Sequence, residues 1–330
     1  MSKLPFNVAY LDVNDEMREN FSMTPSTYGG GRIVAASFLD LFDNFHIYGP
    51  GGCFKEVQFP KNQQCHILQN YERKAIREGA DIDQVIGSYM SKNYDLIVHH
   101  FSNIHINTKL PTLCWPVGYA EPIHPDNKHI ALFDIQNQAP QFFSNNHSIY
   151  NVVIGPRMPE FQEYEKEDFI YCCGRLTRTY QSIQIAQLAT KYEIPIVFSG
   201  PIDRGHPFLD YLSDYVTYLG VVDNETKVEY NKKAKMTAQM MNYPISVTLS
   251  MKEAAAVGVG CLAMPVGQYR SWLRPSINGF FVRSEEEFVQ GWERRDELNQ
   301  KSIYDSVQMF SENNMINKFI EAFKLVVNHG

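Results

Sequence analysis

The chain has 330 residues, of which 44% are apolar and 20% are charged. This composition excludes a disordered protein, and the length predicts two globular domains of roughly 150 residues each. The formal net charge of −7 argues against binding along a nucleic-acid backbone, because that affinity depends on Lys and Arg contacts to phosphates.

Cysteine usage and the absence of long apolar runs indicate the compartment. The six cysteines show neither CxxC nor paired spacing, which favours buried free thiols over disulfides or a zinc site. Residues 1–16 contain too short an apolar run for a signal peptide, and no window reaches the roughly 18 apolar residues of a transmembrane segment. We therefore expect a cytoplasmic protein; a peripheral membrane contact stays open.

A glycine-rich turn follows the first expected strand, residues 6–13. Gly29, Gly30 and Gly31 precede an expected helix over residues 32–42. Such a turn lets backbone N–H groups approach a ligand closely. The spacing matches neither GxGxxG nor a P-loop, so a plain tight turn remains an equal interpretation.

The first half continues with alternating elements. We expect a helix over residues 71–90 and strands over 45–48, 94–101, 111–115, 129–135 and 150–154. This alternation predicts a mostly parallel sheet, whose ligands lie at the carboxyl ends of strands. His99 and His100 stand at such an end and point to opposite faces, so at most one reaches a cleft. Either histidine also fits a structural, hydrogen-bonded role, and the lack of HExxH spacing argues against a metal site.

The strand and helix pattern starts again near residue 160. We expect strands over 169–173, 194–199, 216–222, 238–242 and 261–265, with helices over 180–192, 207–214, 224–234 and 249–257. Apolar residues at helical spacing predict a last helix over residues 315–327. The fold class is thus α/β, in two similar halves.

The segment from Cys172 to Gly200 is the most informative one. A strand ends at Gly174, and a helix follows with Arg175 and Arg178 at its entry. Two guanidinium groups and the free N–H groups of a helix start suit a phosphate.

Five sequence blocks follow one another in the second half: VVIGPRMPEF, FIYCCGRL, VTYLGVVDNETKVEYNKKAKM, MKEAAAVGVGCLAMPVG and INGFFVRSEEEF. In this order they resemble VIPNGVDxxxF, FLFVGRL, VxFLGxVxxEELxxLYxxAxx, LLEAMAxGxPVIAxxxG and VNGLLVxPxDxEx, which are blocks of the family 4 glycosyltransferases of GT-B architecture. Each block is degenerate, but their order is not expected by chance. In the first half, residues 28–31 match the family's glycine loop, and YDLIVHHF matches a DVVHxH strand end, with His100 on the second histidine.

The resemblance implies two Rossmann-like α/β domains facing each other across a cleft. It implies an acceptor-binding domain over residues 1–160, a nucleotide-sugar-binding domain over 161–305, and a C-terminal helix, 306–330, that returns to the first domain. It also implies a retaining, metal-independent hexosyl- or pentosyltransferase whose donor is a UDP- or GDP-sugar, with no tightly bound cofactor.

The resemblance also assigns roles to residues. Arg175 would hold the diphosphate, and Arg178 would replace the family's second cation, whose position is occupied by Tyr180. Glu253 would bind the nucleotide ribose or the sugar, and His100 would lie near the reacting sugar. The donor would also meet the following backbone positions: Gly29, Gly30, Gly31, Thr248, Leu249 and Ser250.

One departure from the family concerns the reaction. The first glutamate of the ExxxxxxxE motif is replaced by Ile245, which leaves the sugar and the mechanism open. The resemblance implies an acceptor that is a glycan, a lipid-linked molecule or another hydroxyl compound. Alternatives are a viral-type DNA glycosyltransferase acting on hydroxymethylated bases, and a non-catalytic nucleotide-sugar-binding module. The same fold also serves epimerases and phosphorylases.

Overall fold

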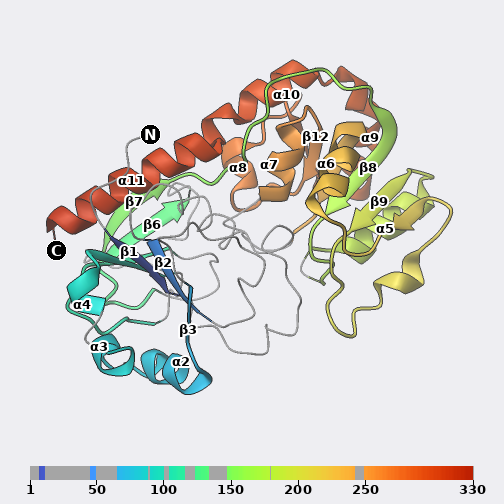
Figure 1. Ribbon diagram of the computed structural model, residues 1–330. Coiled ribbons are helices and arrows are strands. Elements are labelled where there is room, and N and C mark those ends of the chain that lie inside the picture. The colour runs from blue at the N-terminus through green and yellow to red at the C-terminus, as the bar shows by residue number, and fades with distance from the viewer. Residues whose placement is uncertain are drawn as a thin grey trace. The chain divides into compact units, whose positions relative to one another are not determined.

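The chain divides into two compact units. The computed structural model describes residues 7–11, 45–49, 65–87, 90–99, 104–115, 123–133, 147–178, 180–241 and 249–329. Unit 1 comprises Met1–Val153 with Met315–Gly330, and unit 2 comprises Ile154–Asn314 (Figure 1). Among the helices of these residues, none combines the length and apolar character that crossing a membrane requires.

Unit 1 is built on a parallel sheet with its first strand in the interior. The described strands are β1 (Val8–Leu11), β2 (Phe45–Gly49), β3 (Cys65–Ile67), β4 (Leu96–His99), β5 (Thr112–Cys114), β6 (His129–Phe133) and β7 (Ser148–Val152). Their order is β3-β2-β1-β4-β5-β6-β7, and β1 pairs in parallel with both β2 and β4. Strands on both sides of the first one are typical of a doubly wound fold.

The helix expected over residues 71–90 is a wrong prediction, because that segment forms three short helices. They are α2 (Asn70–Arg77), α3 (Ile82–Val85) and α4 (Met90–Asn93). Gly79 follows α2 with φ of 91°, a left-handed conformation that ends the helix. Asp81 then caps α3 by accepting a hydrogen bond from the Asp83 N–H at 2.8 Å.

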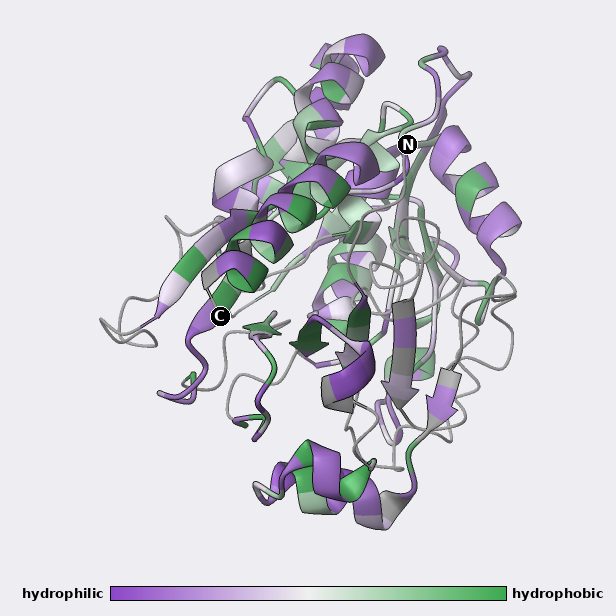
Figure 2. Cartoon of the chain, turned by 60° about the vertical axis from the view of Figure 1, so that its left-hand side comes forward, coloured by the Kyte–Doolittle hydropathy of each residue, from purple (hydrophilic) through white to green (hydrophobic). Residues whose placement is uncertain are grey.

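The predicted C-terminal helix is confirmed as α11 (Glu312–His329). Figure 2 shows apolar and polar residues alternating along this helix up to the C-terminus. Its apolar side is buried in unit 1, where the Phe319 ring packs edge-on against Trp115 at a centroid distance of 5.0 Å. The last helix therefore supplies core side chains to the unit that contains the first strands.

Unit 2 repeats the doubly wound arrangement. Its strands are β8 (Glu167–Cys173), β9 (Ile196–Ser199), β10 (Val216–Tyr218), β11 (Ala234–Gln239), β12 (Gly260–Ala263) and β13 (Gly279–Phe281), in the order β10-β9-β8-β11-β12-β13. The helices are α5 (Ser182–Lys191), α6 (Asn224–Lys233), α7 (Leu249–Ala255), α8 (Tyr269–Trp272), α9 (Glu285–Glu293) and α10 (Gln300–Val307). All pairings between these strands are parallel. Ile170, Phe198 and Leu262 from three of these strands lie in the buried core.

Three elements of unit 2 differ from the sequence-based expectation, and the strand expected over 216–222 is β10, which ends at Tyr218. The strand expected over 238–242 is β11, which begins four residues earlier, because Ala234 leaves the helix with φ of −66° and ψ of 141°. The apolar pattern of the sequence does not reveal the start of β11, because the second residue of the strand, Lys235, is charged. The Nζ of Lys235 pairs with Asp168 at 2.9 Å and with Asp296 at 2.6 Å. The helix expected over 207–214 is a short 3-10 turn, Phe208–Tyr211, ended by the extended residue Leu212.

Candidate functional site

A pocket opens in unit 2 between β8 and β11, where the strand order of the sheet reverses. It is lined by residues at the carboxyl ends of β8 and β11 and at the starts of α5 and α7, and its empty volume, open solvent included, is about 360 Å³. The chain runs from β8 to β9 and β10 on one side and returns to β11 on the other. Ligands of open α/β sheets bind outside the strand ends at such a point. The lining residues are Cys172, Cys173, Gly174, Arg175, Leu176, Tyr180, Ser182, Ile185, Phe198, Thr237, Ala238, Gln239, Ser250 and Met251.

Gly174 leaves the backbone at the pocket's edge uncovered. Its φ is 153°, and a Cβ placed there would meet no heavy atom within 4 Å. The Gly174 N–H donates to the Ser199 carbonyl at 3.0 Å, which ties the end of β8 to β9. The turn into α5 is therefore anchored on the sheet, with space beside it for a ligand.

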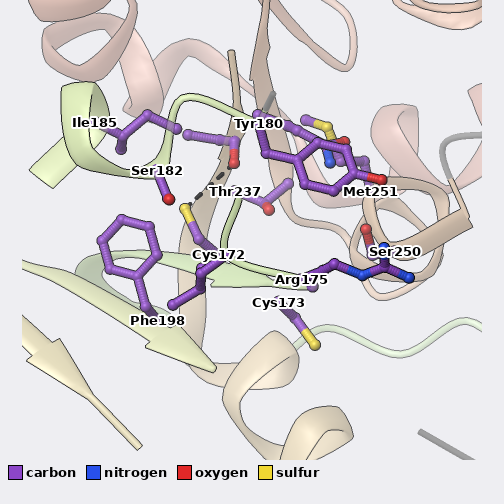
Figure 3. Close-up of a pocket in the computed structure, with 14 residues that line it drawn as sticks. Cys172, Cys173, Arg175, Tyr180, Ser182, Ile185, Phe198, Thr237, Ser250 and Met251 are labelled. Atoms are coloured by element: carbon purple, nitrogen blue, oxygen red, sulfur yellow. Dashed lines mark hydrogen bonds between the residues drawn. The ribbon is translucent and has the colours of Figure 1, made fainter. Parts of the chain in front are cut away.

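One side of the pocket is apolar. Phe198 and Ile185 are buried and face Cys172, whose thiol donates a hydrogen bond to the Ala238 carbonyl at 3.2 Å (Figure 3). Burial raises the pKa of Cys172 to about 12. The neutral thiol is therefore a packing group at neutral pH rather than a nucleophile.

The other side is polar and carries a cation. Arg175 is exposed, and its side chain extends toward Ser250 on α7 in Figure 3. Among the residues that the structure describes, no carboxylate pairs with Arg175. Hydroxyl and amide groups of Thr237 and Gln239 also face the pocket, and Gln239 accepts a hydrogen bond from the Tyr269 hydroxyl. A guanidinium without a counter-anion beside hydroxyl groups suits an anionic oxygen ligand.

Glu253 lies beside the pocket and is held by a lysine. The Nζ of Lys227 on α6 donates to both carboxylate oxygens of Glu253, at 3.2 and 3.1 Å. The side chains are 10% and 23% exposed. Both charges act electrostatically on Cys173, a pocket residue whose thiol pKa is raised chiefly by burial. Glu253 is thus next to the strand end that carries Arg175, although it does not line the pocket itself.

The structure brings together only some of the residues that the sequence singled out. Arg175 and Ser250 line one pocket, and Leu249 is a buried apolar side chain at the start of α7. Arg178 is exposed outside the lining and lies near His206, whose pKa is lowered chiefly by burial and slightly by Arg178. The candidates outside the described residues are Gly29, Gly30, Gly31, His100 and Thr248.

His99, the neighbour of His100, is fully buried at the end of β4. Its carbonyl accepts a hydrogen bond from the Trp115 N–H at 2.6 Å. His99 therefore lies in the interior of unit 1, and the prediction that the two histidines point to opposite faces stays a prediction because His100 is outside the described residues. Within the described ranges, no three His, Cys, Asp or Glu side chains gather as metal ligands would.

Sequence reasoning missed Lys227. The inward-facing residues of α6 are Lys227 and Asn231, so an apolar stripe does not mark the buried side of this helix. A lysine standing where the resembling block has a leucine, within VTYLGVVDNETKVEYNKKAKM, was a signal that could have identified it. Buried charges are rare unless they are paired, which makes such a position informative.

Comparison with known proteins establishes the fold. No protein-family model matches the sequence, and no curated protein sequence matches it. Among solved structures, the chain is similar to AviGT4, a glycosyltransferase involved in avilamycin A biosynthesis, with a TM-score of 0.69, 15% identity and 99% coverage of both chains. It is also similar to sucrose-phosphate synthase from Thermosynechococcus elongatus, with a TM-score of 0.79, 13% identity and coverage of 98% of this chain and 100% of that one.

A third structure was solved with bound molecules. Anabaena HepE in complex with UDP and glucose matches with a TM-score of 0.66 and 11% identity, over 97% of this chain and 100% of that chain. At such identities the similarity concerns the fold, and function has to be argued from the site. The chain has the two-sheet α/β fold of GT-B glycosyltransferases.

Proposed function

We propose that this protein is a glycosyltransferase that moves a sugar from a nucleotide diphosphate sugar to a hydroxyl acceptor. The observation that carries the proposal is the exposed Arg175, which lines a pocket at the point where the strand order of unit 2 reverses. The fold supports the proposal, because solved structures with this fold include a glycosyltransferase, AviGT4, and Anabaena HepE in complex with UDP and glucose. The donor is then a UDP- or GDP-sugar.

The chemistry of transfer fits the charge of the pocket. When the bond between the anomeric carbon and the phosphate oxygen breaks, the electron pair stays on the nucleoside diphosphate. Arg175 offsets that developing negative charge, because a guanidinium binds phosphate oxygens in a bidentate fork. The acceptor oxygen forms the new bond to the anomeric carbon, and its proton passes to an oxygen of the departing nucleoside diphosphate.

Other residues complete this proposal. Glu253 would accept hydrogen bonds from hydroxyl groups of the donor, since a carboxylate has several acceptor positions. The backbone of Leu249 and Ser250, with Thr248, would face the phosphates. The roles predicted for Gly29, Gly30, Gly31 and His100 concern residues outside the described ranges and stay predictions. Arg178 as a second phosphate ligand stays a prediction.

The finer assignments follow the family 4 resemblance. They are transfer of a hexose or pentose with retention of configuration, no metal requirement, a cytoplasmic location, and a glycan or lipid-linked acceptor with or without a peripheral membrane contact. Unit 2 would bind the donor and unit 1 the acceptor. Modified DNA is the alternative acceptor. The net charge of −7 of the chain argues against it, because binding to DNA depends on Lys and Arg contacts to phosphates.

The test uses the full chain and a panel of UDP- and GDP-sugars without acceptor. Thermal unfolding and release of free nucleotide diphosphate are followed together. A donor at about 100 times its dissociation constant should stabilise the protein by roughly 2.7 kcal/mol. We expect one donor to stabilise the chain and to be hydrolysed slowly.

Matched arginine variants localise the effect. Arg175→Ala should weaken donor binding about 10- to 100-fold, because a charge-assisted contact contributes roughly 1.5–3 kcal/mol. Arg294→Ala is the control, since Arg294 is paired with Glu297 at 2.7 Å on the surface at the end of α9. Stabilisation without turnover, also after addition of candidate acceptors, would favour a non-catalytic binding module. No response to any donor would refute the proposed site.

A further inference from the structure

The pocket of unit 2 carries little positive charge for a phosphate site. Among the described residues that line it, Arg175 is the only charged one. Two lysines on the neighbouring helices are directed to other groups. The Nζ of Lys227 is held by the Glu253 carboxylate at 3.1 Å, and the Nζ of Lys252 donates to the Ile154 carbonyl at 2.8 Å.

The remainder of unit 2 adds no cation to this lining. Arg178 is exposed outside the lining and lies near His206. Thr179 and residues 242–248 lie outside the described ranges of unit 2, and their sequence contains neither Lys nor Arg. As far as unit 2 is described, Arg175 therefore supplies the whole positive charge of the pocket lining.

Tyr180 lines the same pocket at the entry to α5. Its N–H donates to the Thr177 hydroxyl at 3.2 Å, which fixes the backbone of this turn. In Figure 3 the Tyr180 ring and the Arg175 side chain both extend toward the start of α7. A phenol is neutral at neutral pH. Tyr180 thus gives the pocket contact surface without charge, at a position from which a longer cationic side chain would reach the space beside Arg175.

The charge of a phosphate group depends on its esterification. In a nucleotide diphosphate sugar each phosphate carries one negative charge, whereas the end phosphate of a free nucleoside diphosphate loses a second proton near pH 6. The cost of taking an anion out of water rises with the square of its charge, but attraction to one cation rises only linearly. A pocket with one cation therefore does not hold the more highly charged phosphate more tightly.

We infer that Tyr180 is a specificity-determining residue, which keeps the pocket at one cation and so prevents a preference for the free nucleoside diphosphate over the donor. The inference rests on the proposed function, because it concerns the diphosphate of the same donor. After sugar transfer, the nucleoside diphosphate loses a further proton to solvent and gains a charge without gaining affinity. The product is then not retained by the charge that the reaction creates.

The test compares ligands that differ by one charge. UDP and its methyl ester at the β-phosphate share base, ribose and both phosphates, but the ester lacks the second charge of the end phosphate. Affinities of the full chain for this pair, and for GDP and its β-methyl ester, are measured by titration calorimetry at about pH 7.5. The wild type should bind the two forms of its preferred nucleotide within about threefold of each other. Tyr180→Lys should bind the free diphosphate about tenfold more tightly than the ester, because the added cation pairs with the extra charge.

Two variants separate charge from other effects of the substitution. Tyr180→Phe keeps a neutral ring, so the ratio of the two affinities should equal that of the wild type, whatever happens to each affinity. Tyr71→Lys makes the same substitution at a residue that is 71% exposed and does not line the pocket, and it should also keep the wild-type ratio. Circular dichroism checks that each variant is folded. If Tyr180→Lys does not fold, Tyr180→Arg adds the same charge and takes its place.

The pH dependence gives a second measurement. Below about pH 6 the end phosphate of UDP binds its second proton, so UDP and the ester then carry equal charge. The tenfold preference of Tyr180→Lys should therefore fall toward one at about pH 5, while the wild-type ratio stays close to one across this range. A variant that only disturbs the shape of the pocket would not follow the titration of the ligand.

The outcomes are distinct. A wild type that binds the free diphosphate more than about tenfold more tightly than the ester overturns the inference, leaves the donor site intact and supports Arg178 as a second cation. A folded Tyr180→Lys with the wild-type ratio, or with a preference that persists at about pH 5, also overturns it. If neither nucleotide nor its ester binds the wild type, the proposed function fails and the inference falls with it.

Discussion

At the residue scale, Lys166 has a perturbed pKa and lies at the N-terminal end of β8, whereas the pocket lies at the C-terminal end of that strand. Lys166 stands just before β8, and its Nζ donates to the carbonyls of Val257 at 3.0 Å and Asn231 at 3.4 Å. Both carbonyls belong to the C-terminal ends of helices, where a cation is favoured. Burial nevertheless lowers the pKa of Lys166 to about 7.

This pKa predicts a dependence of stability on pH. Above about pH 7 the folded chain leaves Lys166 neutral, whereas the unfolded chain keeps the lysine protonated up to its ordinary pKa. The unfolded state then binds more protons, so the free energy of unfolding rises with pH, by at most ~1.4 kcal/mol per pH unit. Lys166→Met should remove this rise, which urea unfolding at several pH values between neutral and about pH 9 measures.

The control for this prediction is an exposed lysine. Lys301→Met removes a side chain that is 50% exposed and paired with Asp305, and it should leave the pH slope of the wild type unchanged. Parallel pH curves for the wild type and Lys166→Met would show that burial does not perturb Lys166.

At the element scale, α9 depends on its first turn. Ser284 precedes the helix in an extended conformation, and its hydroxyl accepts a hydrogen bond from the Glu287 N–H at 3.2 Å. Three glutamates, residues 285 to 287, follow at the N-terminal end, where negative charge is stabilising. The helix buries Phe288 and Trp292 against the core of unit 2, so its start is coupled to that core.

Removal of this cap should destabilise the unit measurably. Ser284→Ala is expected to lower the free energy of unfolding by about 1 kcal/mol, because one N–H at the helix start loses its acceptor. Chemical denaturation checks this value. Ser284→Asp, which restores an acceptor, should stay close to the wild type, and an equal loss in both variants would assign the effect to something other than capping.

At the scale of the whole molecule, the two units differ in how the chain supplies their cores. Unit 2 is one continuous segment, Ile154–Asn314, whereas unit 1 needs Met315–Gly330 in addition to its first 153 residues. In unit 1 the helix α11 buries Met315, Phe319, Phe323 and Val326, and Phe319 contacts Trp115. A fragment without α11 would expose to water the apolar side chains of unit 1 that α11 covers, such as Trp115.

Fragments should therefore behave differently. We expect residues 154–314 expressed alone to fold cooperatively, since their core is complete within the segment. Residues 1–153 alone should unfold at lower temperature or aggregate, and addition of residues 312–330 as a peptide should raise their melting temperature. Thermal unfolding followed by circular dichroism measures both. Cooperative folding of residues 1–153 without the peptide would contradict this expectation.

The sequence predicted the fold class and many elements, and the α/β class with two parallel sheets is confirmed. The helix predicted over 224–234 is α6 to within one residue, because its N-terminal signal, Asp223, is local. The helix predicted over 71–90 failed at Gly79, since helical periodicity alone does not reveal a left-handed residue. For the site, the sequence indicated Arg175 and Ser250, which share a pocket; the donor roles of these residues, and of Glu253, stay predictions.

The sequence by itself determined the alternation of strands and helices, the glycine at the end of β8 and the cation after it, because periodicity, turn chemistry and adjacency are local properties of the chain. Only the tertiary structure decided the strand order and the pairing of Lys227 with Glu253 across two helices. It also decided which polar groups of β11 and α7 line the same pocket as Arg175. These contacts join residues far apart in the chain, and their geometry depends on how helices pack on a sheet rather than on any local pattern.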